Sequence, residues 1–205
     1  MLDMTKFAKE VHAVSVEHGW WEGERDDAKC VALMCCEVAE AVEEYRAGRP
    51  MMWYKCREGG EVAPVCVENA CVAWLNEGCD ICSRDNKPEG IAVELIDCCL
   101  RILDFAGERS WEMWPEYRTF EQFCEYECDA LEGWNLMRVA AWLFTEISAC
   151  LDVESNQVYR VDRLMEIVGS IARWIEAQGV DFEKVLRIKH EYNKTRPYRH
   201  GGKRC

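Results

Sequence analysis

Residues 90–107, GIAVELIDCCLRILDFAG, constrain the fold more than any other part of the chain. Their apolar side chains cover nearly every face at helical spacing, which is typical of a helix inside a bundle. Glu94 and Asp97 interrupt this pattern three residues apart, on one face. Two carboxylates are costly to bury unless they are paired or hold a cation. The segment therefore predicts a helical bundle with a charged site in its interior.

Helical periodicity also dominates the rest of the chain. The helices that we expect cover about 5–18, 26–47, 88–107, 134–152, 159–178 and 181–195. A further short helix follows the capping box of Thr119 and Gln122. Strand patterns are confined to 52–56 and 61–67, which predict a small hairpin. The expected fold class is all-α, with a Cys-rich inserted loop or hairpin at 51–87.

A weak internal repeat relates the two halves of the chain. The helix that carries Glu37 can be laid over the one that carries Glu146, and likewise Glu94 over Glu166. Two other acidic positions become Ala149 and Gly169 in the second copy, so this copy is degenerate. Any two amphipathic helix pairs align comparably, and chance similarity is the alternative.

Glu37 and Glu40 supply a second pair of carboxylates, three residues apart on the helix expected at 26–47. Alone, such a pair is typical of a solvated helix face. Facing Glu94 and Asp97 across a bundle, it completes a set of four acidic groups that repel one another. Oxygen ligands of this kind suit Mg²⁺, with Mn²⁺ as a second choice, and Mg²⁺ also bridges to substrate phosphates. The four carboxylates therefore predict a metal site.

Two other interpretations of these carboxylates are open to test. Arg101 follows Asp97 by four residues and offers an ion pair without any metal. A di-iron bundle is the other rival, but it needs Glu-x-x-His on two helices. None of the four histidines follows a glutamate at that spacing.

Charge and composition narrow the function classes. The chain has 38 acidic against 25 basic residues, a net charge of −13, which argues against binding to nucleic acid. It shows no signal-peptide pattern at its start and no apolar run of membrane-spanning length. The 14 cysteines often fall inside apolar helical patterns, where a reduced thiol packs as a small hydrophobe. These features predict a cytoplasmic protein without a membrane partner.

Glu37-x-x-Glu40 and Glu94-x-x-Asp97 resemble the ExxE…ExxD signature of the all-α nucleoside triphosphate pyrophosphatases, the MazG and dimeric dUTPase superfamily. The stretches HGWW, KPEGIAVELID and KHEYNKTRPYRHGGK are similar to segments of small MazG-like proteins of bacteria and phages. The resemblance implies an enzyme that hydrolyses a (d)NTP to a (d)NMP and pyrophosphate. It implies that these four acidic residues hold Mg²⁺ and carry catalysis.

The resemblance also suggests how the substrate is held. Lys189, Asn193 and Arg196 lie at i, i+4 and i+7 on the last expected helix, and they would bind the phosphates. A frayed basic terminus is the alternative for this segment. Trp20 and Trp21 would stack on the base, although aromatic residues beside a helix start more often serve packing.

The chain departs from the family in three ways. Cys36 stands where MazG usually carries an additional glutamate, and the segment 51–87 lengthens the spacing between the two motifs. A second helical half, 108–205, with the basic tail at its end, follows the MazG-like catalytic half at 1–107. The repeat leaves open whether the chain is a homodimer or satisfies its helix faces internally. A non-catalytic protein that binds nucleotide or a partner on the same fold is the alternative function.

The insertion carries one candidate metal motif of its own. Cys79 and Cys82 have the CxxC spacing of a zinc knuckle. No second CxxC is present in the insertion, so Cys56 and either Cys66 or Cys71 would have to complete a zinc site. A loop with incidental thiols is the alternative.

Overall fold

The computed structural model of the protein describes residues 3–23, 25–55, 87–112, 120–128, 131–151 and 157–199. The helices of this part of the chain are α1 (Met4–Glu17), α2 (Asp27–Arg46), α5 (Ile91–Glu108), α6 (Phe120–Glu127), α7 (Leu136–Ala149), α8 (Gln157–Ala177) and α9 (Phe182–Lys194). Its strands are β1 (Trp53–Lys55) and β2 (Lys87–Glu89). The expected all-α class is confirmed. No helix among the described residues is long and apolar enough to cross a membrane.

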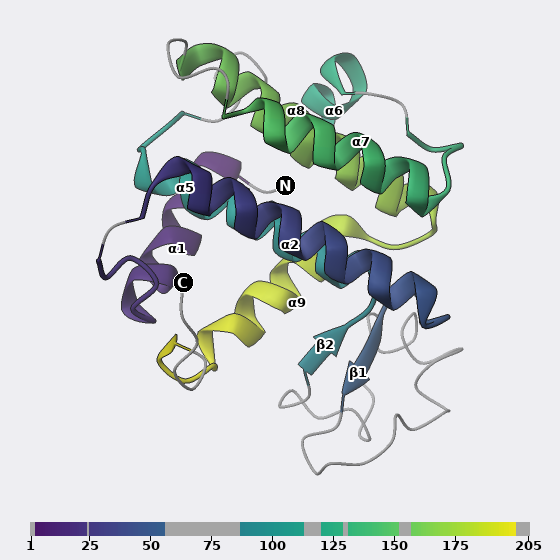
Figure 1. Cartoon of the computed structure of the whole chain (residues 1–205), viewed down its shortest axis with the longest axis horizontal. Helices are drawn as coiled ribbons and strands as arrows, with labels where there is room; N and C mark the ends of the chain where they lie inside the picture. The colour runs from purple at the N-terminus through teal and green to yellow at the C-terminus, as the bar shows by residue number, and fades with distance from the viewer. Residues whose placement is uncertain are drawn as a thin grey trace.

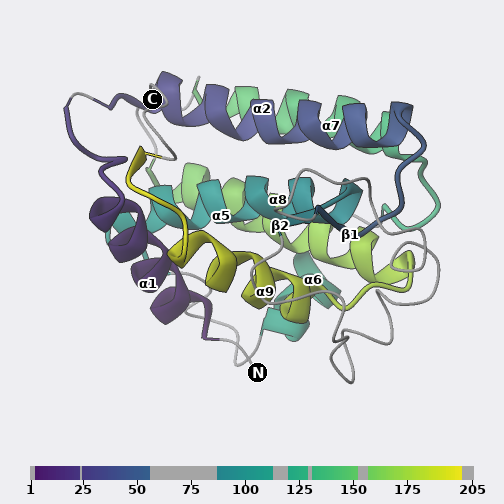
Figure 2. The ribbon, with the colours of Figure 1, turned by 90° about the horizontal axis from the view of Figure 1, so that it is seen from below.

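The helices stack in three layers around α5. α2 lies beside α7 in the outer layer, and α5 lies beside α8 in the layer beneath them (Figures 1 and 2). α1 and α9 cover the other side of α5, and α6 packs against α8 (Figure 2). Within α5, all residues from Ile91 to Gly107 are buried except Asp97 and Arg101, which are half-buried. The central helix therefore brings its polar positions into the core, as its sequence predicts.

Local chemistry explains where the helices begin. Four helices begin in the same way: the side chain just before the helix accepts a hydrogen bond from its third N–H. These capping residues are Asp3 for α1, Asp26 for α2, Asn135 for α7 and Asp181 for α9. The expected helix ends differ from the observed ones by no more than three residues.

The start of α5 differs from the prediction. Pro88 is expected in the first turn of the helix, but it lies in β2 opposite Tyr54 of β1, and the helix begins at Ile91. Gly90 makes the turn between them with a φ of 118°, a conformation that favours glycine. A Cβ on Gly90 would lie 2.8 Å from the carbonyl oxygen of Met51. The N–H of Ala92 donates to that carbonyl at 2.9 Å, so backbone from the segment after α2 caps α5.

A small two-stranded sheet lies within the described residues. β1 pairs with β2 in antiparallel register, with Trp53 opposite Glu89. The strand expected at 61–67 lies outside the described residues, as do Cys79 and Cys82 of the proposed zinc knuckle and Thr119 of the capping box.

Candidate functional site

A cavity of about 290 Å³ opens where α1, α2, α5 and α9 meet. Its size is near the lower end of the range for small-molecule sites, roughly 300–1,000 Å³. The loop after α1 contributes Trp20 to its wall, and β2 contributes Lys87. Segments from both halves of the sequence therefore build one site.

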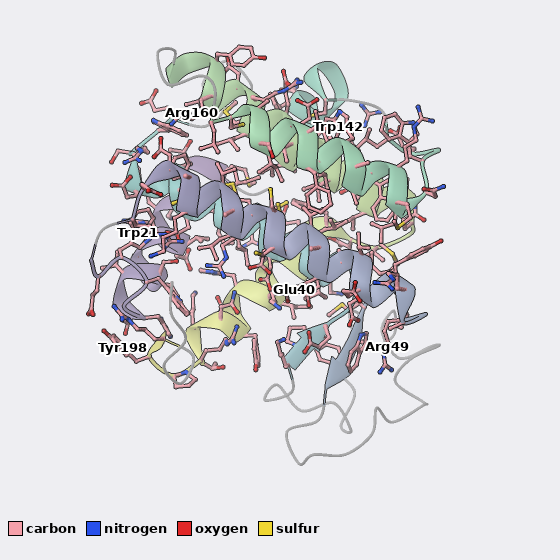
Figure 3. The ribbon with its side chains drawn as sticks, in the orientation of Figure 1. Trp21, Glu40, Arg49, Trp142, Arg160 and Tyr198 are labelled. Carbon is pink, nitrogen blue, oxygen red and sulfur yellow. The ribbon has the colours of Figure 1, made fainter. Side chains whose placement is uncertain are left out.

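Three carboxylates converge in the wall of this cavity. Glu37 of α2 and Glu94 and Asp97 of α5 each offer an oxygen, and these oxygens all lie within 4.8 Å of one another. Glu37 and Glu94 are buried, whereas Asp97 is half-buried. The fourth predicted ligand, Glu40, lines the same cavity but is exposed, on the side of α2 that faces α9 (Figure 3). The structure thus brings three of the four predicted ligands into one close group.

Burial strongly changes the acidity of two of these groups. Burial and the neighbouring charge of Asp97 raise the pKa of Glu37 to about 7, although the Arg101 guanidinium opposes the shift. Burial raises the pKa of Glu94 to about 9, against the attraction of the Lys189 ammonium. Without a cation, Glu94 is therefore protonated at neutral pH. Strongly perturbed carboxylates that line a cavity are typical of functional sites.

Two cations pair with the cluster, Arg101 in the cavity wall and Lys189 inside the protein. Nε of Arg101 donates to Glu37 Oε1 at 3.0 Å. Nζ of Lys189 lies 2.8 Å from Asp97 Oδ2. Lys189 is completely buried, and it does not form part of the cavity wall where a substrate phosphate would lie. Its observed partners are thus a carboxylate of the cluster and the carbonyl oxygen of Pro88, to which its Nζ donates at 3.4 Å.

The other two predicted phosphate-binding residues do line the cavity. Arg196 is half-buried, and burial lowers the pKa of its guanidinium although Asp97 opposes that shift. Within the described part of the chain, no carboxylate lies within ion-pair distance of this guanidinium. The side-chain oxygen of Asn193 is buried and has no hydrogen-bond partner among the described residues. Both side chains are therefore available to a ligand.

The two adjacent tryptophans have different environments. Trp20 is buried and lines the cavity. Trp21 does not line it: its Nε1 donates to Asp104 Oδ1 at 2.8 Å, and the Arg25 guanidinium lies over its ring at 4.4 Å from the centroid. The structure therefore places Trp20, and not Trp21, where a ligand could contact it.

Asp104 is a buried site residue that the sequence analysis missed. It lines the cavity, and its carboxylate also contacts Nδ1 of His12 at 2.9 Å. The signal was present, because Glu94, Asp97, Arg101 and Asp104 follow one another by three or four residues on an otherwise apolar helix. The polar stripe is longer than the motif alone suggests.

Comparisons of the chain with known protein families, with curated proteins and with solved structures find no match. The described residues form a helical protein in which a largely buried acidic cluster lines a cavity.

Proposed function

We propose that this protein is a Mg²⁺-dependent nucleoside triphosphate pyrophosphohydrolase of the MazG-like kind, which cleaves a (d)NTP to a (d)NMP and pyrophosphate. The observation that carries the proposal is the grouping of Glu37, Glu94 and Asp97 within 4.8 Å in the wall of the cavity. Arg196 lines the same cavity and forms no ion pair among the described residues, and the unpartnered oxygen of Asn193, a hydrogen-bond acceptor, belongs to a residue of the same wall. A cluster that attracts a cation beside a guanidinium that attracts an anion suits a metal–polyphosphate substrate.

The chemistry of the donor set fits Mg²⁺ or Mn²⁺. All three close ligands are carboxylates, the type that hard cations prefer. Burial raises the pKa values of Glu37 and Glu94, so the metal-free cluster is partly protonated and a divalent cation would displace those protons. When bound, such a cation would neutralise phosphate charge and lower the pKa of the attacking water.

Side chains of this protein would accept the proton of the attacking water and bind the phosphates. Glu40 is exposed at the cavity one helical turn after Glu37, where its carboxylate would accept the proton of the attacking water. The Arg196 guanidinium would bind the phosphate oxygens in bidentate fashion, and the Asn193 amide would donate to them. Lys189 would keep Asp97 charged and in place from inside the protein.

The lining of the cavity also suits a nucleoside. Apolar side chains from three helices, Val11, Leu33 and Leu100, line it together with Trp20. An aromatic ring and aliphatic side chains in the same wall as a charged cluster match a ligand that carries both a flat base and phosphates. Trp20 is the residue that we assign to stacking on the base.

The second helical half would serve as a scaffold. α7 and α8 hold Glu146 and Glu166, the counterparts of Glu37 and Glu94 in the proposed repeat. Both carboxylates form ion pairs with the guanidinium of Arg163. An arginine thus stands between them, which supports one metal site per chain.

The alternative is a protein that binds nucleotide without turnover. Two observations favour it: Cys36 stands in place of a family glutamate, and Arg101 and Lys189 already neutralise two of the carboxylates. A structural ion-pair network perturbs pKa values as an active site does. Only turnover separates the two functions.

The deciding experiment measures pyrophosphate and monophosphate release from a panel of deoxy- and ribonucleoside triphosphates, with Mg²⁺, with Mn²⁺ and with EDTA. Metal-dependent release of both products is expected. Glu40→Gln should abolish release without unfolding the protein, because Glu40 is exposed. Glu43→Gln is the matched control, since Glu43 is on the same helix but pairs with Arg46 outside the cavity. Folded wild-type protein that binds nucleotide and releases nothing would establish the alternative.

A further inference from the structure

Two segments far apart in the sequence meet beside the cavity. Residues 195–199, just after α9, lie against residues 18–22, just after α1, and we call this pair of segments the clasp. Nε2 of His18 lies 2.8 Å from the carbonyl oxygen of Arg196, and the N–H of Arg199 donates to the carbonyl of His18 at 3.1 Å. Figure 3 shows Tyr198 at the end of α9, on the side of the molecule that also holds Trp21.

Side chains extend the clasp on its outer face. Nε of Arg199 donates to the carbonyl of Gly19 at 3.2 Å, and its Nη2 lies 3.2 Å from the Glu22 carboxylate. The hydroxyl of Tyr198 donates to the same carboxylate. Glu22 therefore binds two residues of the C-terminal segment at once.

Gly19 fits the clasp for two reasons. Its φ of 76° lies in the left-handed region, which glycine adopts without strain. A Cβ at this position would lie 2.3 Å from the ring of Tyr198. The backbone at Gly19 and the ring of Tyr198 are therefore in direct contact, and a larger residue at this position would require the exposed Tyr198 ring to move.

The clasp holds the backbone that carries Arg196. Helix α9 ends at Lys194, so its hydrogen-bond ladder does not continue through Arg196. After the helix, contacts to His18, Gly19 and Glu22 hold the backbone of residues 195–199 in place. The Arg196 guanidinium meanwhile faces the cavity without an ion pair in the described part of the protein.

We propose that the clasp positions Arg196 for binding the phosphates of the nucleotide, with His18, Glu22 and Tyr198 as positioning residues. The inference rests on the proposed function, because Arg196 needs a phosphate ligand. A guanidinium held in place before binding loses less conformational freedom when the ligand arrives. Opening the clasp should therefore weaken binding roughly three- to tenfold, the range for one immobilised side chain.

The test uses the full chain and a non-hydrolysable α,β-methylene nucleoside triphosphate with Mg²⁺, with Kd measured by calorimetry. Glu22→Ala removes the outer contacts of the clasp, and Glu22 does not line the cavity. Glu17→Ala is the matched control, an exposed glutamate at the end of α1 that forms no contact to the clasp among the described residues. We expect Glu22→Ala to raise Kd roughly three- to tenfold and Glu17→Ala to leave it unchanged.

A double-mutant cycle distinguishes positioning from general structural damage. If Glu22 acts through Arg196, the double variant Glu22→Ala/Arg196→Ala should bind no more weakly than Arg196→Ala alone. Binding by Glu22→Ala at the wild-type Kd, or additive losses in the cycle, would overturn the positioning role while leaving the proposed function intact. No binding of the analogue by folded wild-type protein would overturn both.

Discussion

The ammonium of Lys189 lies 2.8 Å from the carboxylate of Asp97, and Lys189 has no exposed surface. Burial lowers the pKa of Lys189, but the charges of Asp97 and Glu94 outweigh it and raise that pKa above the ordinary value. Lys189 is therefore a charged group inside the protein. It acts as the counter-ion of an acidic cluster that would otherwise repel itself.

Lys189→Met should accordingly destabilise the metal-free protein by about 3–5 kcal/mol, because it leaves the Asp97 carboxylate without its buried counter-charge. Urea unfolding in EDTA measures this change in the free energy of unfolding. Lys9→Met is the control, since Lys9 is exposed on α1, and its effect should stay within about 0.5 kcal/mol. Mg²⁺ should recover part of the loss in Lys189→Met. Equal unfolding free energies for the two variants would contradict the role of Lys189.

The acidic cluster should make the stability of the metal-free protein depend on pH. The pKa values of Glu37 and Glu94 are raised from 4.5 to about 7 and about 9 on folding, so the folded state holds protons that the unfolded chain releases. Their contribution is fully present below about pH 4.5 and is lost as pH rises through 7 and then 9. Unfolding free energies measured in EDTA between pH 5 and pH 9 should fall. In Glu37→Gln the fall between pH 5 and pH 7 should be shallower, while the fall due to Glu94 should continue to about pH 9.

Glu94→Gln separates metal binding from stability. Because the pKa of Glu94 is about 9, the side chain is already neutral at pH 7, and an amide of the same shape should change the metal-free stability little. The amide cannot provide the charged ligand, so the rise in melting temperature on adding Mg²⁺ should shrink or vanish. Thermal unfolding with EDTA and with excess Mg²⁺ measures both effects. A full Mg²⁺ response in this variant would remove Glu94 from the ligand set.

The sequence predicts the carboxylate cluster well because its signal is local. Glu94 and Asp97 stand out on an apolar helix, and the helix that carries Glu37 is equally regular, so element type and face follow from spacing. Asp104 was equally readable as the next polar position of the same stripe. Glu40 shares the face of Glu37 by spacing, yet one more turn along α2 leaves it exposed.

The positions of Lys189 and of the clasp depend on tertiary packing, which the spacing of residues in the sequence does not reveal. Lys189 and Asn193 lie one turn apart on α9, and Arg196 follows the end of this helix. α9 approaches α5 so that Lys189 is buried against Asp97 while the other two reach the cavity. His18 lies 178 residues from its partner Arg196. No periodic pattern connects residues so distant in sequence.

Gly107 near the end of α5 provides a test of how α1 is held against the site. A Cβ on Gly107 would lie 2.4 Å from the carbonyl oxygen of Ala8 and 2.7 Å from the Cβ of His12, and a backbone contact cannot be relieved by rotating a side chain. Within a helix, Gly→Ala ordinarily raises the free energy of unfolding by roughly 0.5–1 kcal/mol. Whether Gly107→Ala raises or lowers it therefore shows whether α1 packs this closely.

Gly107→Ala should reverse that sign and destabilise by about 1–3 kcal/mol, because α1 has to move away from α5. Val11 on α1 lines the cavity, so nucleotide binding should weaken as well. Gly133→Ala is the control, since nothing lies within 4 Å of its added Cβ, and it should be neutral or slightly stabilising. Urea unfolding compares the two variants directly. A Gly107→Ala protein more stable than wild type would mean that α1 does not pack against α5 as closely as in the structure. The residues of α1 would then not form the cavity wall described above.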